Sequence, residues 1–255
     1  MSEIFNESFE KTKIAGSIAS GALDEVSKII KPGITTNKID NLCYEFINDH
    51  DAYSAPLYYR GYPKSCCTSA NHIVCHGIPS DKVLIEGDII NVDVTAFKDG
   101  WHGDTSRMFE VGEVSIKAKK LIKTTYESLM EAIKILKENI KLGDIGSAIQ
   151  THVEAQGFSV VQDFCGHGIG KVFHKEPNIL HFGQKGTGEK IKAGMIFTIE
   201  PMINYGKFET KILNDGWTAV TKDKSLSAQF EHTVGITRDG CEIFTNSKNL
   251  DNLLK

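Results

Sequence analysis

Residues 92–106, VDVTAFKDGWHGDTS, carry one aspartate into a predicted turn and a second aspartate out of it. Four apolar residues before the turn fall on one face by the period-2 alternation of a β-strand, namely Ile90, Val92, Val94 and Ala96. Asp93 therefore lies on the other face. Asp-Gly after such a run is a hairpin signal, so we predict a β-hairpin that turns at residues 98–100.

A turn centred near Lys98 and Asp99 predicts that Asp93 and Asp104 lie directly opposite each other, with Cβ atoms about 5 Å apart. Two carboxylates at that distance repel each other unless one is protonated or a cation lies between them. A β-bulge would shift the register by one residue. The hairpin thus predicts a cation site, and the rest of the chain must supply further ligands.

The composition is that of an ordinary globular protein. The chain has 255 residues, of which 40% are hydrophobic and 24% charged, with a net charge of −4. This charge creates no global field that would recruit nucleic acid or an anionic membrane, and no apolar run approaches the roughly 18 residues of a membrane span. Residues 1–11, MSEIFNESFEK, lack the basic and apolar regions of a secretory signal. We expect neither a membrane partner nor specific nucleic-acid recognition.

The cysteines do not suit a disulfide framework. There are six, with no C-x-x-C spacing: Cys43, Cys66, Cys67, Cys75, Cys165 and Cys241. Two of them are direct neighbours. The pattern indicates free thiols in a reducing cytoplasm and excludes a zinc-finger module.

Helical periodicity appears in both halves of the chain. The predicted helices cover residues 14–30, 36–47, 115–141 and 144–157, with Thr36, Ser115 and Asp144 as capping residues. A strand run and its return strand occupy residues 83–111, and short strands follow residue 166. Because no linker or composition break interrupts the chain, we predict one α+β domain over residues 1–255. Each half has helices followed by a strand run with acids, which hints at a duplication.

Four further short motifs carry residues that can bind a metal. They are CHGIP, CGHGIG, FTIEP and AQFEHT, and they contribute His76, His167, Glu200 and Glu231. Each acid taken alone is better explained as a solvated or salt-bridged strand residue. Together with the two hairpin aspartates, however, four acids and one imidazole suit hard or borderline divalent ions such as Mn²⁺ or Fe²⁺ better than structural Zn²⁺. Four carboxylates carry more negative charge than one divalent ion can neutralise. This argues for two ions, about 3.5–4 Å apart.

The order and spacing of seven short stretches resemble the type I methionine aminopeptidases, in their bacterial-type short form, from about residue 5 to 250. The stretches are VCHGIP (74–79), NVDVT (91–95), HGDTS (102–106), GHGIG (166–170), FHKEP (173–177), FTIEPM (197–202) and SLSAQFEHT (225–233). The resemblance implies the α+β pita-bread fold, in which two pseudo-symmetric halves form a curved antiparallel sheet flanked by helices. It also implies removal of the initiator methionine from nascent proteins when the second residue is small, by a metal-bridging water or hydroxide.

The same resemblance implies a role for each ligand. Asp93 would chelate one metal, Asp104 and Glu231 would bridge the two metals, and His167 and Glu200 would complete the second site. The ions would be Mn²⁺, Fe²⁺, Co²⁺ or Zn²⁺, and a monovalent cation can bind as well.

Further roles follow from the family pattern. His174 would hydrogen-bond the scissile carbonyl, His76 would contact the substrate backbone, and Glu200 would carry the proton from water to the leaving amine. The methionine pocket would be apolar and sulfur-friendly. Its expected residues are Tyr59, Tyr62, Cys67, Phe173 and Trp217; taken singly, each aromatic residue also fits ordinary core packing.

Two positions depart from the family pattern, and one surface suggests a partner. Arg60 and His72 replace residue types common in relatives, and both flank the expected pocket. The predicted helix 115–141 carries a lysine-rich face. The resemblance to the bacterial enzymes implies a weak ribosome contact through it, but the face also fits a solvated helix surface. These lysines are Lys117, Lys119, Lys120, Lys123, Lys134 and Lys137. The family also implies a monomer.

Two other readings remain open at this point. An aminopeptidase P or prolidase would share the fold, but those relatives carry a large N-terminal domain, and only about 75 residues precede His76. A metal-free binding protein of the same fold would lose its ligands, whereas all five positions are intact here. A type II enzyme needs a long insertion between Glu200 and Glu231, and the 31 positions between them leave no room for it. The zinc-binding extension of eukaryotic cytosolic type I enzymes is also absent.

Overall fold

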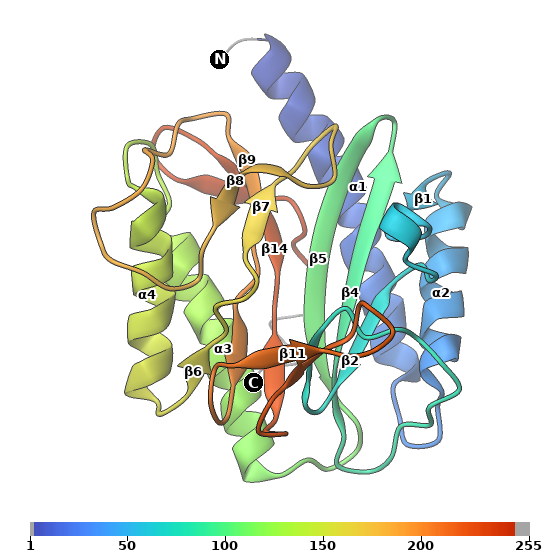
Figure 1. Ribbon diagram of the computed structural model, residues 1–255. Coiled ribbons are helices and arrows are strands. Elements are labelled where there is room, and N and C mark those ends of the chain that lie inside the picture. The colour runs from blue at the N-terminus through green and yellow to red at the C-terminus, as the bar shows by residue number, and fades with distance from the viewer. Residues whose placement is uncertain (1–2, 248–255) are drawn as a thin grey trace.

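The computed structural model describes residues 3–247, with side chains from Glu7 onward. Figure 1 shows two pairs of helices on the outside and strands between them. The helices are α1 (Glu3–Ile29), α2 (Thr36–Asp49), the 3-10 helix η1 (Tyr59–Gly61), α3 (Ile116–Lys134) and α4 (Leu142–Ala155). The strands of the first half are β1 (Tyr53–Ser54), β2 (Cys67–Ala70), β3 (Ile73–Cys75), β4 (Ile89–Lys98) and β5 (Trp101–Glu110). Those of the second half are β6 (Ser159–Val160), β7 (Gly166–Gly168), β8 (Lys175–Ile179), β9 (Ile196–Ile199), β10 (Met202–Asn204), β11 (Thr210–Ile212), β12 (Ala219–Thr221), β13 (Ser227–Gln229), β14 (His232–Ile236) and β15 (Cys241–Ile243).

In the first half, α1 packs on one face of the β4–β5 hairpin, and α2 packs beside it against α1 and the neighbouring strands β1 and β2 (Figure 1). The apolar face predicted for β4 lies under these helices, and all four of its residues are fully buried: Ile90, Val92, Val94 and Ala96. Gly103 of β5 lies against Gly16 of α1 so closely that a Cβ at Gly103 would overlap the backbone of the helix. Helix packing therefore leaves the opposite face of the hairpin, with Asp93, free to line a site.

In the second half, α3 and α4 pack against each other and cover shorter strands. Helix α3 contacts β10 and β13, and α4 contacts β6 and β8. A second hydrophobic core joins helix residues such as Leu121 and Ile149 to Phe197 of β9 and to Phe230, which directly follows β13. The two halves thus repeat one plan, two helices over antiparallel strands, which supports the predicted α+β class.

All strand pairings are antiparallel, and the halves meet at a seam. One sheet has the order β1-β4-β2 with β5 paired to β4, and another has the order β15-β14-β9-β7-β8. Two smaller sheets, β13-β10-β6 and β11-β12-β3, complete the strands. An isolated bridge between Ser106 and Glu231 connects β5 to the chain just before β14. One predicted ligand therefore lies on the seam itself.

The register of the hairpin differs from the prediction. Lys98 pairs with Trp101, so the loop is the two-residue Asp99-Gly100, with φ values of 48° and 86°. This is the geometry of a hairpin turn with two left-handed residues, which matches the twist of the strands. Asp93 consequently pairs with Ser106, and Asp104 pairs with Thr95. The predicted direct opposition of Asp93 and Asp104 was wrong; they are diagonal neighbours on the same face, a spacing of about 7–8 Å between Cα atoms.

Four helix boundaries also differ. Helix α1 begins at Glu3 rather than near residue 14. The N-cap of α2 is Thr35, not Thr36, and its side chain accepts a hydrogen bond from the Lys38 N–H. Helix α3 ends at Lys134 rather than near residue 141, because the following segment pairs with another part of the chain: Asn139 N–H donates to Ile191 O. Asp144 caps α4 from its third position, where its carboxylate accepts the Lys141 N–H at 2.8 Å.

Two expectations from composition can be compared with the structure. All six cysteines are free, as predicted, and Cys43, Cys66, Cys67 and Cys75 are buried. Among residues 3–247, no helix combines the length and apolarity that crossing a membrane requires.

Candidate metal centre and substrate cavity

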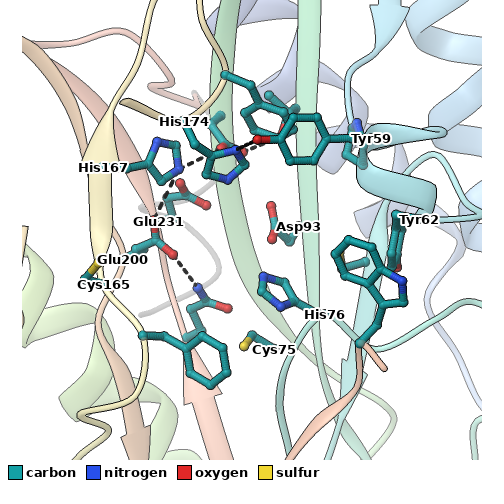
Figure 2. Close-up of a pocket in the computed structure, with 18 of the residues that line it drawn as sticks. Tyr59, Tyr62, Cys75, His76, Asp93, Cys165, His167, His174, Glu200 and Glu231 are labelled. Atoms are coloured by element: carbon teal, nitrogen blue, oxygen red, sulfur yellow. Dashed lines mark hydrogen bonds and ion pairs between the residues drawn. The ribbon is translucent and has the colours of Figure 1, made fainter. Parts of the chain in front are cut away.

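A cavity of about 360 Å³ contains all five predicted metal ligands (Figure 2). Asp93 and Asp104 enter it from the β4–β5 hairpin of the first half. The second half supplies the others: His167 lies on β7, Glu200 directly follows β9, and Glu231 directly precedes β14. The cavity therefore depends on both halves of the molecule.

The ligand atoms are close enough to share a cation. Nε2 of His167 lies 3.6 Å from Oδ2 of Asp104 and 3.7 Å from Oε1 of Glu200. Ligand atoms of Asp104, His167 and Glu231 all lie within 4.8 Å of one another. Asp93 faces the same space from the other side of the cavity (Figure 2). Their ligand roles stay predictions, but the structure brings the five side chains together.

The acidic side chains of the cavity lie close together and are buried from water. Burial, together with the charges of Asp104 and Glu200, raises the pKa of Asp93 and that of Glu231 well above their usual values. Burial is also the chief reason why the pKa of Glu200 is raised to about 7. Burial by itself would lower the pKa of His167, but its hydrogen bond to Asp104 and the charge of Glu200 outweigh that effect and raise it. These directions are those of acids that need a nearby cation to stay charged.

One carboxylate oxygen in the cavity indicates whether a metal ion fits the site. Within residues 3–247, Oε1 of Glu231 is buried and has no hydrogen-bond partner. A buried acceptor without a partner is costly, and a cation would satisfy it. Carboxylates with one imidazole are also donors that suit Mn²⁺, Fe²⁺ and similar ions. The residues present therefore fit a divalent metal.

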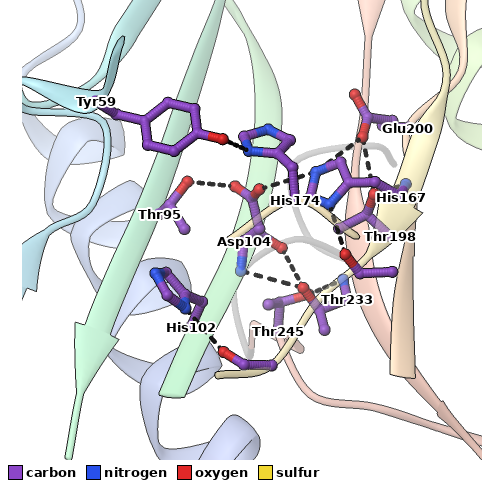
Figure 3. A network of polar contacts seen from close by, with 12 residues as sticks. Tyr59, Thr95, His102, Asp104, His167, His174, Thr198, Glu200, Thr233 and Thr245 are labelled. Atoms are coloured by element: carbon purple, nitrogen blue, oxygen red, sulfur yellow. Dashed lines mark hydrogen bonds and ion pairs between the residues drawn. The ribbon is translucent and has the colours of Figure 1, made fainter. Parts of the chain in front are cut away.

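Two threonines support the acids, and sequence reasoning missed both (Figure 3). The hydroxyl of Thr95 donates to Oδ1 of Asp104 at 2.6 Å. The hydroxyl of Thr198 donates to Oε1 of Glu200 at 2.8 Å and accepts the N–H of His167 at 3.0 Å. The only signal in the sequence was spacing, since each threonine lies on a strand two positions from an acid and thus on the same face.

Two histidines border the ligands. Nδ1 of His174 lies 3.1 Å from the hydroxyl of Tyr59, and its ring centre is 4.2 Å from that of His167. Burial and the neighbouring His167 lower the pKa of His174 to about 4. His76 has a left-handed backbone with φ of 56°, and its ring meets Phe164 edge-on at 5.6 Å. Burial lowers the pKa of His76, so both rings are neutral at pH 7.

Aromatic and sulfur-containing side chains line the rest of the cavity. The five residues expected to form the methionine pocket all line this cavity: Tyr59, Tyr62, Cys67, Phe173 and Trp217. The rings of Tyr62 and Trp217 meet edge-on at 5.1 Å, and those of Tyr59 and Phe173 lie 4.9 Å apart. Sequence reasoning missed other lining residues, including Pro56, Cys75, Phe164 and Met202.

The two departures from the family pattern occupy different places. Arg60 lines the cavity, whereas His72 lies on the turn between β2 and β3 and is not among the lining residues. The lysine-rich face also differs in detail, because α3 ends before Lys137. The six lysines are exposed, and Lys123 and Lys134 form ion pairs with acids of the same helix.

Known proteins resemble this chain over nearly its whole length. The model of metallopeptidase family M24 matches residues 10–238. Methionine aminopeptidase from Rickettsia prowazekii is 56% identical over 95% of both chains, and that of Escherichia coli strain K12 is 52% identical over 95% of this chain and 93% of its own. The crystal structure of the R. prowazekii enzyme covers 94% of this chain and 98% of its own, with 55% identity and a TM-score of 0.94.

More distant structures share the fold. Methionine aminopeptidase from Thermotoga maritima is 42% identical with a TM-score of 0.93, over 94% of this chain and 97% of its own. An X-Pro aminopeptidase from the same organism has a TM-score of 0.75 at 23% identity, over 95% of this chain and 61% of its own. The predicted pita-bread fold is confirmed. Together with the match over residues 10–238, the identity to curated relatives shows that the chain belongs to metallopeptidase family M24 and, within it, to the type I methionine aminopeptidases.

Proposed function

We propose that this chain hydrolyses the first peptide bond of peptides and nascent proteins that begin with methionine and have a small second residue. One observation carries the proposal: a single cavity joins five ligand-type side chains to an aromatic, sulfur-containing pocket, in a chain 56% identical to a methionine aminopeptidase. A pocket of this kind suits a thioether side chain.

A divalent metal belongs to the function, since the family is one of metallopeptidases and the cavity holds a cluster fit for an ion. We propose that two ions bind, held by Asp93, Asp104, His167, Glu200 and Glu231, with Mn²⁺, Fe²⁺, Co²⁺ or Zn²⁺ as candidates. A monovalent cation is a further candidate. When bound, divalent ions supply an activated water and polarise the scissile carbonyl.

Glu200 is the proposed proton carrier. Burial raises the pKa of its carboxyl to about 7 in the protein alone, and a bound divalent ion would lower it, so that the carboxylate form would be present to accept a proton. Hydrogen bonds hold both of its oxygens, from Thr198 at 2.8 Å and from Nε2 of Gln229 at 3.3 Å. Glu200 would take a proton from the attacking water and deliver it to the leaving amine.

His174 and His76 are the proposed contacts to the substrate backbone. If the Tyr59 hydroxyl donates to Nδ1 of His174, the proton of the neutral ring is on Nε2. That N–H would donate to the oxygen of the scissile carbonyl and stabilise the negative charge that develops on it. His76, wedged between Phe164 and Trp217, would contact the backbone near the scissile amide.

The decisive experiment measures amino-acid release from Met-Ala-Ser and from Ala-Pro-Ala. Enzyme stripped with a chelator is assayed with Mn²⁺, Fe²⁺, Co²⁺ or Zn²⁺ added back. Metal-restored methionine release without Xaa-Pro cleavage is expected. Xaa-Pro cleavage would assign a prolidase-type activity instead, and a folded protein that no metal activates would point to a binding protein.

Selectivity for the second residue gives a further prediction. We expect rapid methionine release from Met-Ala-Ser and Met-Ser-Ser and none from Met-Lys-Ser, because the family that this chain resembles accepts only a small second residue. Steady-state kinetics with the three peptides tests this. Efficient cleavage of Met-Lys-Ser would contradict the proposed pocket.

We also propose that residues 1–255 form a single catalytic domain that acts as a cytoplasmic monomer. A weak ribosome contact through the exposed lysines of α3 is part of this proposal. Co-sedimentation with ribosomes at low and high salt tests the contact. Salt-sensitive pelleting would support it, and no pelleting beside a known exit-site binder would refute it.

A further inference from the structure

Arg60 is an unpaired cation at the edge of the cavity. Its side chain is exposed and lines the cavity, and its guanidinium carbon lies 5.3 Å from the ring centre of Tyr59. Within residues 3–247, Arg60 makes no ion pair with an acidic side chain, whereas buried Arg107 pairs with Asp24. A fixed positive charge therefore borders the entrance to a cavity whose interior is acidic.

Backbone hydrogen bonds hold the turn that contains Arg60 in a defined conformation. Arg60 and Tyr58 both have left-handed backbones, with φ values of 50° and 65°. A tight turn locks them, since Tyr58 N–H donates to Tyr62 O at 2.8 Å and Tyr62 N–H donates to Tyr59 O at 2.9 Å. The Tyr62 side chain is buried and anchors the turn through its hydroxyl, which donates to the carbonyls of Cys66 and Gly77. Non-glycine residues adopt this backbone at an energetic cost, and such strain clusters at functional sites.

Arg60 also lies at a defined distance from the proposed chemistry. Arg60 and His174 both lie against the ring of Tyr59, and the ring centre of His174 is 5.1 Å from that of Tyr59. The guanidinium of Arg60 is therefore within about 10 Å of the imidazole proposed to contact the scissile carbonyl. An extended peptide spans about 3.3–3.6 Å per residue, so this distance corresponds to about three residues.

We propose that Arg60 selects substrates with an acidic side chain at the third to fifth residue of the peptide and disfavours a basic side chain there. This inference rests on the proposed function, because the peptide that follows the methionine must leave the cavity past its open edge. A carboxylate there would pair with the guanidinium, and an ammonium would be repelled. Because Arg60 is exposed, the effect is that of a surface ion pair, about two- to fivefold for each charge, and weakens with salt.

The test compares matched peptides on the metal-loaded enzyme. The peptides are amidated, so that no terminal carboxylate interferes, and share the form Met-Ala-Ser-X-Ser-Ser, with Glu, Gln or Lys at X. At low ionic strength kcat/KM should fall in the order Glu, Gln, Lys, with about a four- to 25-fold ratio between the first and the last. The ratio should approach one in Arg60→Gln and invert in Arg60→Glu. In a longer amidated peptide, Met-Ala-Ser-Ser-Ser-Ser-X-Ser, the ratio should be lost.

Lys117→Gln is the matched control. Lys117 is also exposed and lies 5.6 Å from a tyrosine ring, that of Tyr205, but it does not line the cavity. Its removal should leave the ratio unchanged. An equal ratio in the native enzyme and Arg60→Gln would overturn the inference while methionine release from the Gln peptide upheld the proposed function. If the Gln peptide were not cleaved either, the proposed function would fail and this inference with it.

Discussion

The two halves of the molecule supply ligands in different ways. In the first half one long hairpin carries both aspartates, 11 positions apart, on a single regular face. In the second half three separate segments each bring one ligand: His167, Glu200 and Glu231. Local alternation is thus enough to place the first pair on a common face, whereas the second set depends on how distant strands meet. The ligands of the first half can therefore be predicted from one local strand pattern, whereas those of the second half depend on contacts between segments far apart in the sequence.

Despite this difference, each half supports an acid with a threonine. Thr95 bonds Asp104 across the hairpin, and Thr198 bonds Glu200 along β9. Only Thr198 also bonds a second ligand, since it accepts the N–H of His167. The second half therefore uses one hydroxyl to couple ligands that the first half couples through the strand pairing itself.

Asp104→Asn should have the largest effect. We expect turnover of Met-Ala-Ser to fall by more than about 100-fold, the upper range for residues that merely support a metal ligand, with the fold intact. The control is Asp99→Asn at the tip of the same hairpin, where asparagine tolerates the left-handed backbone. Steady-state kinetics and circular dichroism measure both. Near-normal turnover of Asp104→Asn at saturating metal would break the claim that the hairpin supplies a ligand.

Metal removal should weaken the whole fold, because the ligands come from both halves. Metal at about 100 times its dissociation constant should add about 2.7 kcal/mol to the free energy of unfolding relative to chelator-stripped protein. Urea denaturation with and without Mn²⁺ gives the value, and Asp104→Asn should lose most of the gain. Identical unfolding curves for stripped and loaded native protein would contradict a site shared by the halves.

The threonines sharpen the comparison directly. Thr95→Val and Thr198→Val should each weaken metal binding by about 10–100-fold, as loss of a supporting hydrogen bond does, with the larger loss for Thr198 because it holds two ligands. Calorimetric titration with Mn²⁺ measures the affinities, and serine at either position should restore them. A larger loss at Thr95 would reverse the proposed asymmetry.

The smallest effects are expected at the helix caps, where the halves should be equivalent. Thr35 accepts the Lys38 N–H at 3.3 Å, and Ser115 accepts the Ala118 N–H at 3.2 Å. Alanine at either position should cost about 1 kcal/mol of the free energy of unfolding, without loss of activity in folded protein. Urea denaturation of the two variants, with Thr35→Ser and Ser115→Thr as controls, compares them. Unequal losses would show that one half depends more on its helices.

The hairpin illustrates how far sequence patterns reach. Alternation placed Asp93 on the face opposite Val92 and Val94, and the buried face of β4 agrees. The register failed because Asp-Gly forms the two-residue turn itself, which moves the centre of the loop toward Gly100. Side chains alternate between the two faces of a strand with a period of two. A register error of two residues therefore leaves each side chain on its predicted face, and both aspartates still lie on one face.

Long-range contacts account for what the sequence could not predict. The end of α3 depends on the pairing of Lys141 with Lys190, a partner about 50 positions away, which overrides local helix propensity. The support of Glu200 and His167 by Thr198 likewise requires β7 and β9 to be neighbours. In the second half, short motifs identified His167, Glu200 and Glu231 as candidate ligands, but only the resemblance to a known family indicated that they share one site.

The seam at Ser106 and Glu231 has a consequence for folding kinetics. Glu231 N–H donates to Ser106 O, and the Thr105 hydroxyl donates to Glu231 O, across a sequence separation of 126 in the second case. Contacts so distant in the chain form late, because closing a long loop costs entropy before the contact returns any stability. During refolding, the helical circular dichroism signal should therefore recover before the rate of methionine release does. The time course of regained activity would then report when the two halves dock.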